Sequence, residues 1–305
     1  MYKRTLFLSL ISLFLLLISS CVSIPPQTRL ISPMADKAVF SECNINSIPA
    51  SLKAPETSFK QLDPQHISII NWNIYKAQRD NWSSDFKALI KNQNLVLLQE
   101  AINRPDITKP LQTEQPHWHL NTAFYYDNHE AGVLTASSIP PIYSCGLRAT
   151  EPLIRIPKTV LINLYPLKNS SQVLLVANLH SINFTLGTDA YAEQILAMSS
   201  VIKQHSGPVI IAGDFNSWSN ARIEIINTMV NTLSLKSLAY NNHNRIRVFG
   251  HALDHVFYRG LEITAEETLK VSSSDHNPIK VSFRLSAQNK PVNPNYALRL
   301  HPHYK

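Results

Sequence analysis

The sequence predicts an α+β domain in which two sheets pack on each other and helices cover the outside. Two observations predict this class: short apolar runs outnumber the helical segments, and the helical segments are scattered among those runs. The 305 residues are 44% apolar and 16% charged, which is typical of a globular chain and not of a disordered one. Seven glycines against 19 prolines also exclude a glycine-rich linker architecture.

The predicted strands are short runs rich in Val, Ile and Leu, whose length suits strands buried on at least one face. In chain order they cover residues 67–70, 95–98, 132–136, 160–164, 173–177, 209–212, 255–258 and 279–283. Three helices are expected between some of them: one from Ser83 or Ser84 to Lys91, one after Thr188 that ends before Gly207-Pro208, and one over about 220–235.

The first twenty residues differ from the rest of the chain. Lys3 and Arg4 precede an apolar run over residues 6–18, which is shorter than the roughly 20 residues that cross a bilayer. This pattern predicts a secretory signal peptide over residues 1–20. The text "ISSC" that ends at Cys21 resembles the bacterial lipobox, which implies a lipid on Cys21 and a place in the cell envelope facing the periplasm. Val22 in the next position favours the outer membrane; an uncleaved membrane anchor is the alternative.

Residues 21–64 carry six prolines and little periodicity, so we predict a tether and an irregular N-terminal segment there. The domain follows over residues 65–285, and residues 286–305 form a polar tail. With Cys21 modified, Cys43 and Cys145 are an even pair in an oxidising compartment, either joined in a disulfide or present as two separate buried thiols. The formal charge of +7 permits a polyanionic substrate or an anionic membrane surface.

Polar side chains stand at an end of six of the predicted strands, where a packed scaffold holds them rigidly. They are Asn71 and Asn73, Gln99 and Glu100, Asn178 and His180, Asp214 and Asn216, then Asp254, and finally Asp275 with His276. Burying so many carboxylates without partners is costly, and a shared cation with a shared anionic substrate removes that cost. Carboxylate and amide oxygens suit Mg²⁺, whereas zinc prefers more His or Cys.

These residues lie in a set of stretches that resembles the endonuclease/exonuclease/phosphatase superfamily. The stretches are "NWNIYK", "LVLLQEA", "GVLTASSIP", "VANLHSINF", "IAGDFNSW", "LDHVFYRG" and "SSDHNPI", in the order of that family and over about 67–283. The resemblance implies a four-layer α/β/β/α sandwich of two mainly antiparallel sheets flanked by helices, with Mg²⁺, or Mn²⁺, at one end. "WNIYK", "LVLLQEA" and "FYRG" are most similar to the YafD-like bacterial branch.

The resemblance also implies roles for the polar residues. Glu100 is the principal Mg²⁺ ligand, Asn73 lies beside it, and Asp275 completes the metal or phosphate environment. Asp214 orients or deprotonates the attacking water.

The remaining roles follow from the same likeness. Asn216 holds that water or a phosphate oxygen, and His276 acts as general base or stabilises phosphate charge with its tautomer fixed by Asp254. His180 is the second histidine of the deoxyribonuclease and sphingomyelinase branches, with Glu130 as its candidate partner. Tyr191 stands where many relatives carry an arginine, so a basic contact of the family is missing.

We therefore expect an exported, monomeric, Mg²⁺-dependent hydrolase of phosphodiester bonds. The His180 pattern and the positive charge favour nucleic acid as the substrate. The membrane tether and the missing arginine favour a phospholipid or sphingomyelin phosphodiesterase, which is the alternative, and a phosphoinositide phosphatase comes third. A binding module without turnover ranks last, because Glu100 and His276 are both present.

Overall fold

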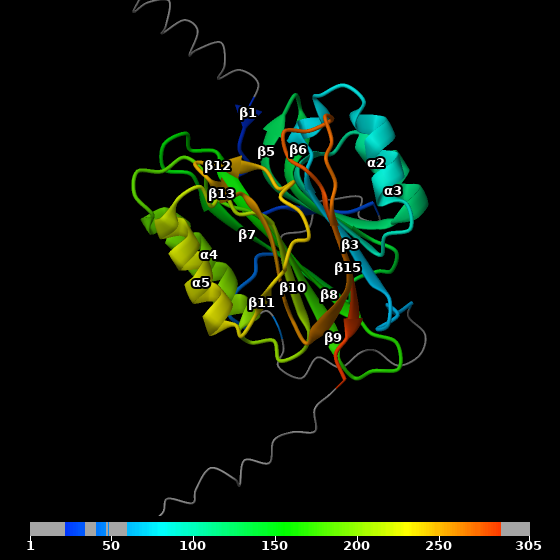
Figure 1. Ribbon diagram of the computed structural model, residues 1–305. Helices are drawn as coiled ribbons and strands as arrows, with labels where there is room; N and C mark the ends of the chain where they lie inside the picture. The colour runs from blue at the N-terminus through cyan, green and yellow to red at the C-terminus, as the bar shows by residue number, and fades with distance from the viewer. Residues whose placement is uncertain (1–21, 34–40, 47, 49–59, 288–305) are drawn as a thin grey trace, which may run out of the picture.

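Figure 1 shows the computed structural model, which describes residues 22–33, 41–46, 48 and 60–287. The predicted signal peptide, Cys21 and nearly all of the predicted tail lie outside the described residues. Among the described residues, none of the helices combines the length and apolar character needed to span a membrane.

The first sheet has eight strands, with β3 and β4 parallel and the other pairs antiparallel. Its order is β1 (Val22–Ser23), β5 (His117–Tyr126), β6 (His129–Ser137), β4 (Leu95–Ile102), β3 (Ile67–Asn73), β16 (Ile279–Leu285) and β15 (Leu261–Thr268), and β2 (Leu30–Ile31) also pairs with β5. The 3-10 turn η1 (Tyr75–Ala77) and helices α2 (Trp82–Ile90) and α3 (Pro105–Glu114) belong to this half.

The second sheet has six strands, of which only β9 and β10 pair in parallel. Its order is β11 (Lys236–Ser237), β14 (Asp254–Arg259), β10 (Val209–Asp214), β9 (Val173–His180), β8 (Pro157–Pro166) and β7 (Tyr143–Thr150). Helices α4 (Asp189–Ile202) and α5 (Asn220–Thr232) belong to this half, together with the small hairpin of β12 (Arg247–Val248) and β13 (His251–Ala252).

Figure 1 shows four layers, with α4 and α5 on one side and α2 and α3 on the other. Three large apolar clusters pack these layers together. Because successive strand residues face opposite sides, Ile67 and Ile69 of β3 pack against the second sheet, while Ile70 and Trp72 pack under α2 and α3. The predicted α/β/β/α sandwich of mainly antiparallel sheets is confirmed.

The sequence patterns missed β5, β7, β15 and α3. Pro110 lies inside α3, which is unusual because proline cannot donate the helical hydrogen bond there, whereas Pro105 at its first position is favourable. Strand β15 carries three glutamates as a charged edge strand, so its apolar pattern is weak. Helix α4 ends at Ile202, before the predicted stop at Gly207-Pro208. Asn81, not a serine, occupies the N-cap position of α2, without a capping hydrogen bond from its side chain.

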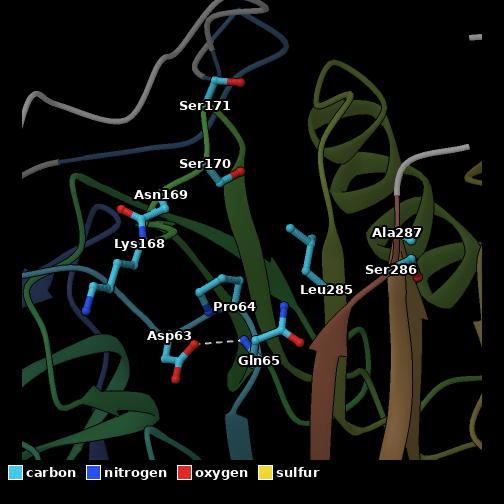
Figure 2. Close-up of a pocket in the computed structure, with 10 residues that line it drawn as sticks. All are labelled: Asp63, Pro64, Gln65, Lys168, Asn169, Ser170, Ser171, Leu285, Ser286 and Ala287. Atoms are coloured by element: carbon cyan, nitrogen blue, oxygen red, sulfur yellow. Dashed lines mark hydrogen bonds between the residues drawn. The ribbon is translucent and has the colours of Figure 1, made fainter. Parts of the chain in front are cut away.

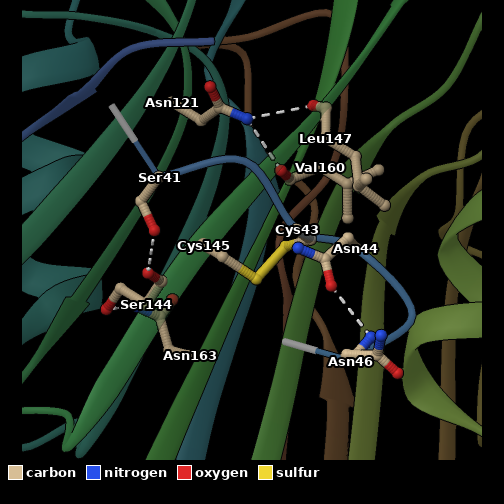
Figure 3. The surroundings of a disulfide bond; sticks show 10 residues. All are labelled: Ser41, Cys43, Asn44, Asn46, Asn121, Ser144, Cys145, Leu147, Val160 and Asn163. Carbon is tan, nitrogen blue, oxygen red and sulfur yellow. Dashed lines mark hydrogen bonds between the residues drawn. A yellow bond between two sulfur atoms is a disulfide. The ribbon is translucent and has the colours of Figure 1, made fainter. Parts of the chain in front are cut away.

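The segment predicted as a tether contributes structure to the domain. Strands β1 and β2 extend the first sheet at β5, and Cys43 forms a disulfide with Cys145 of β7 across a sequence separation of 102 (Figure 3). Beside the disulfide, Ser41 Oγ donates to the carbonyl of Ser144 over 2.9 Å, and Cys43 N donates to that of Gly146, also over 2.9 Å. Of the two alternatives for the cysteines, the disulfide is the one that the structure contains.

Replacing Cys43 and Cys145 together with serine is expected to lower the free energy of unfolding by about 2–5 kcal/mol, because a cross-link over so long a loop restricts the unfolded chain. Urea unfolding followed by circular dichroism measures the change. Wild type in reductant should match the double variant, and the variant itself should not respond to reductant. Equal stability of wild type with and without reductant would contradict the expectation.

Candidate active site

The predicted site residues meet at one end of the sandwich. Strands β3, β4, β9 and β10 end there and β14 begins there, and in the strand register Asp214 stands beside both His180 and Asp254. A hollow of about 680 Å³ lies at the opposite end, where Gln65, Lys168 and Leu285 are among its lining residues (Figure 2). That hollow is therefore remote from the chemistry, in spite of its size.

A chain of three buried groups forms the centre of the site. Asp254 Oδ2 accepts a hydrogen bond from His276 Nδ1 over 2.7 Å, so His276 Nε2 faces Asp214, whose Oδ2 lies 3.7 Å away. Burial alone lowers the pKa of His276, but the charges of Asp254 and Asp214 outweigh it and raise the pKa to about 10. Burial raises the pKa of Asp214 to about 6 against the opposing charge of His276. The predicted pairing of His276 with Asp254 is present.

Asp214 is the hub of the polar contacts. Its Oδ2 accepts from Asn73 Nδ2 over 3.1 Å and lies 3.6 Å from His180 Nε2, while its Oδ1 accepts from Asn216 N over 2.9 Å. With His276, four of the predicted residues, from two strands and two loops, therefore converge on this one carboxylate.

The backbone around Asp214 explains the sequence "GDFN". A side chain on Gly213 would place its first carbon 1.9 Å from the carbonyl oxygen of Leu179, so only glycine allows β10 to approach β9 this closely. Asn216 has a φ of 45°, a left-handed conformation that asparagine tolerates better than most residues. Its Nδ2 donates to the carbonyl of Ser181 over 3.0 Å, which holds the side chain at the base of the site.

Glu100 lies on a break in the sheet register, between Leu98 and Ala101, and has a φ of 52°. Such a bulge turns a side chain out of the regular alternation of the strand. The carboxylate forms an ion pair with Lys76, which lies on η1 with a positive φ of its own. Burial raises the pKa of Glu100, but Lys76 and a hydrogen bond from Asn73 hold it below its ordinary value. Strained backbone on both partners is typical of functional positions.

His180 has a different partner from the predicted one. Its Nε2 accepts from Lys158 Nζ over 2.9 Å, and burial together with the Lys158 charge lowers its pKa well below the ordinary value. The prediction that Glu130 partners His180 is wrong, because Glu130 Oε2 accepts instead from Asn103 Nδ2 over 3.1 Å. Glu130 belongs to β6 of the first sheet, whereas His180 ends β9 of the second.

Asp275 lies at the margin of the site. It is half-buried, and its Oδ1 is 3.3 Å from Ser274 Oγ. Neither Asp275 nor Glu100 belongs to the group of Asp214, Asp254 and His276, whose ligand atoms lie within 4.8 Å of one another. The charge of Asp275 adds to the raised pKa of His276, so its contribution here is electrostatic.

Three of the predicted strand-end amides serve the scaffold. Gln99 Nε2 donates to Asn71 Oδ1 over 2.9 Å and to Asn178 Oδ1 over 2.7 Å, while Asn178 Nδ2 donates to the carbonyl of Leu134 over 2.9 Å. These buried amides join the two sheets beneath the site, although Gln99 Oε1 and Asn71 Nδ2 have no hydrogen-bond partner there.

Four charged residues of the site were absent from the sequence prediction: Lys76, Lys158, Glu151 and Arg222. Arg222 is fully buried, donates to the carbonyls of Ile182, Asn183 and Asn216 over 2.8–2.9 Å, and stacks on Tyr191. An arginine from α5 thus packs against Tyr191, the position where the family resemblance predicted an arginine. A charged residue in an otherwise apolar run, as Lys158 is in "PKTVLINLY", is the only signal in the sequence.

A family model described as the endonuclease/exonuclease/phosphatase family matches residues 70–276, more than half of the chain. The chain belongs to this family. Members of the endonuclease/exonuclease/phosphatase family are hydrolases that act on phosphate esters. The closer likeness to the YafD-like branch stays a prediction.

Solved structures agree on the fold. An endonuclease/exonuclease/phosphatase from Bacteroides vulgatus is 17% identical with a TM-score of 0.56, and the match covers 73% of this chain and 100% of that one. The human Nocturnin catalytic domain with bound sulfate anion is 17% identical with a TM-score of 0.54, and the match covers 75% of this chain and 97% of that one. A mannosyl-6-phosphatase from Bacteroides thetaiotaomicron is 16% identical with a TM-score of 0.54, and the match covers 71% of this chain and 99% of that one. At these identities the likeness shows the fold alone.

Members of the endonuclease/exonuclease/phosphatase family typically use a divalent metal, and the residues of this site fit one. Glu100, Asn73 and Asp214 offer carboxylate and amide oxygens, the donors that Mg²⁺ prefers. Asp254 Oδ1 is buried and has no hydrogen-bond partner. Glu100 already forms an ion pair with the Lys76 ammonium, so its carboxylate lies in a position to stabilise a cation.

Proposed function

We propose that the protein is a divalent-metal-dependent phosphodiesterase, with Mg²⁺ as the metal and Mn²⁺ as an alternative. The observation that carries the proposal is the buried chain of Asp254, His276 and Asp214 next to the oxygen donors of Glu100 and Asn73. Glu100 and Asn73 would hold the metal, which when bound neutralises the phosphate oxygens and stabilises their developing charge.

The chain's own residues supply the remaining functions. Asp214 is placed to orient a water molecule and accept its proton, since its carboxylate meets three polar partners at the floor of the site. His276, with Nδ1 held by Asp254, presents Nε2 to a phosphate oxygen or the leaving group. Lys158, whose ammonium donates to His180 Nε2, adds a positive charge beside the same space.

The sequence and the structure favour different substrate classes. The sequence favours nucleic acid through the His180 pattern and the net charge. The loops around the site expose the aliphatic Leu153 and Leu186, which cannot stack on bases, together with the aromatic Phe184 and Phe249, which can. This mixed apolar surface favours a substrate with a hydrocarbon part. The phosphodiester of a lipid is therefore the candidate that the structure favours, ahead of DNA or RNA and of a phosphoinositide monoester.

Export, a lipid on Cys21, a place on the periplasmic side of the envelope and a monomeric state are part of the same proposal. The N-terminal sequence "ISSC" supports the lipid and the export, and the disulfide, which needs an oxidising compartment, supports the export.

The test is a substrate panel with the full-length protein. Supercoiled plasmid, single-stranded DNA, RNA, sphingomyelin vesicles and a soluble phosphomonoester are incubated with Mg²⁺ or with EDTA, beside a His276→Ala variant. We expect hydrolysis of at least one diester that is lost in EDTA and in the variant. Hydrolysis of the monoester alone, or of nothing, would overturn the phosphodiesterase proposal.

A further inference from the structure

The described surface exposes large apolar side chains mainly around the active site. Five of the eight lie in three loops at that end: Leu153 (54% exposed), Ile154 (46%), Phe184 (51%), Leu186 (85%) and Phe249 (83%). We call these five residues the apolar rim. Exposed apolar patches of this kind mark interaction surfaces more often than chance.

The apolar rim is continuous with the catalytic groups. A hollow of about 370 Å³ is lined by Leu153, Phe184 and Phe249 and reaches Asn216. A second hollow, of about 200 Å³, joins Ile154 and Phe184 to Glu100, Lys158 and His180. An apolar group bound at the rim would therefore be adjacent to a phosphate bound at the site.

Buried polar contacts hold the rim loops in place. Glu151, which is fully buried, accepts from Asn183 N over 2.6 Å, next to Phe184. Trp218 Nε1 donates to Asn183 Oδ1 over 2.9 Å, and the Trp218 ring meets that of Phe249 at 6.2 Å between centroids. These polar contacts thus fix the loops in a conformation that exposes their apolar side chains to solvent.

The N-terminal strand leaves the domain at the same end. Val22 of β1 pairs with Tyr126 at the end of β5, and Tyr126 OH accepts from Gln78, two residues after Lys76. Figure 1 places β1 at the same end as the β12–β13 hairpin that carries Phe249, whereas the last described residues lie at the other end. The predicted anchor at Cys21 is attached one residue before Val22, which is too short a link to hold the site far from the membrane.

We propose that the active-site end docks on a lipid bilayer through the apolar rim, so that the enzyme hydrolyses a phosphodiester of a phospholipid headgroup in the membrane that holds it. This inference rests on the proposed function and names its substrate. Arg155 and Arg247, both exposed beside the rim, match an anionic headgroup layer. The apolar side chains enter the interface while Asn216 and Lys158 remain at headgroup depth.

The first experiment compares two substrates. Full-length wild type, a Leu186→Ser/Phe249→Ser variant and a Leu196→Ser control are assayed on vesicles of phosphatidylethanolamine, phosphatidylglycerol and sphingomyelin, and on soluble bis(p-nitrophenyl) phosphate. Leu196 is 66% exposed on α4, away from the rim, so it matches the change in surface. The rim variant should lose at least tenfold on vesicles and less than twofold on the soluble diester, and the control should lose neither. Equal rates of rim variant and wild type on vesicles would overturn the proposal.

A second experiment reads orientation without activity. Trp218 is the only one of the four tryptophans that is not buried, and it lies in the rim hollow. Brominated phosphatidylcholine vesicles should quench wild-type and Leu196→Ser fluorescence, and quenching should be lost in Trp218→Phe and weakened in the rim variant. If the vesicles did not quench wild-type fluorescence while nucleic acid was still hydrolysed, the docking surface would be rejected and the phosphodiesterase proposal would stand. If the vesicles quenched fluorescence but no substrate was hydrolysed, the proposed function alone would be rejected.

Discussion

A His276→Gln protein is expected to hydrolyse a soluble phosphodiester about 10²–10⁴ times more slowly than wild type at equal Mg²⁺. Glutamine keeps a polar side chain of similar reach but cannot carry the imidazolium charge that Asp254 and Asp214 stabilise. Measuring kcat and KM separately should place the loss in kcat, because His276 acts on the reacting phosphate.

His129→Gln is the matched control, since His129 lies on β6 and its ring forms a hydrogen bond with the carbonyl of Asp127. It should keep wild-type kcat. Circular dichroism on both variants separates lost chemistry from lost folding. More than a tenth of wild-type activity in a folded His276→Gln protein would remove this residue from the mechanism.

A Glu100→Gln protein is expected to lose at least about 100-fold in activity at moderate Mg²⁺, because the amide cannot replace the charge of a metal-binding carboxylate. Mg²⁺ should also raise the thermal midpoint of wild type and not of the variant, since a ligand stabilises the fold that binds it.

Glu130→Gln provides the comparison, because Glu130 lies on the neighbouring strand and contacts Asn103 instead of the site. Its activity and its thermal response to Mg²⁺ should equal those of wild type. If both glutamine variants responded to Mg²⁺ as wild type does, Glu100 would not be a metal ligand.

The sequence predicted the parts of this site that follow from strand ends. Asn73, His180, Asp214 and Asp254 converge because parallel β9 and β10 and their neighbours stop at one level of the sandwich. An apolar run followed by a polar residue was a sufficient signal for Asn73, His180 and Asp214, and the converse order, a polar residue that opens a run, was the signal for Asp254.

The missed residues depend on contacts that sequence patterns do not contain. Lys76 reaches Glu100 because three successive residues of η1 have positive φ, which nothing in "YKA" indicates. Arg222 is buried because carbonyls from two loops and the face of Tyr191 happen to surround it. The pairing of Glu130 with His180 was predicted from the family pattern alone, and that pattern does not determine which strand of which sheet carries each side chain.

The two ends of the described chain have opposite roles in any attachment of this protein. Ala287 borders the hollow remote from the proposed catalytic groups, whereas Val22 lies at the same end of the domain as those groups. A protein coupled to a bead or a sensor chip through its C-terminal side would present its catalytic groups outward to the solution. Coupling through the N-terminal side would turn them toward the support, the orientation that a native membrane anchor would impose.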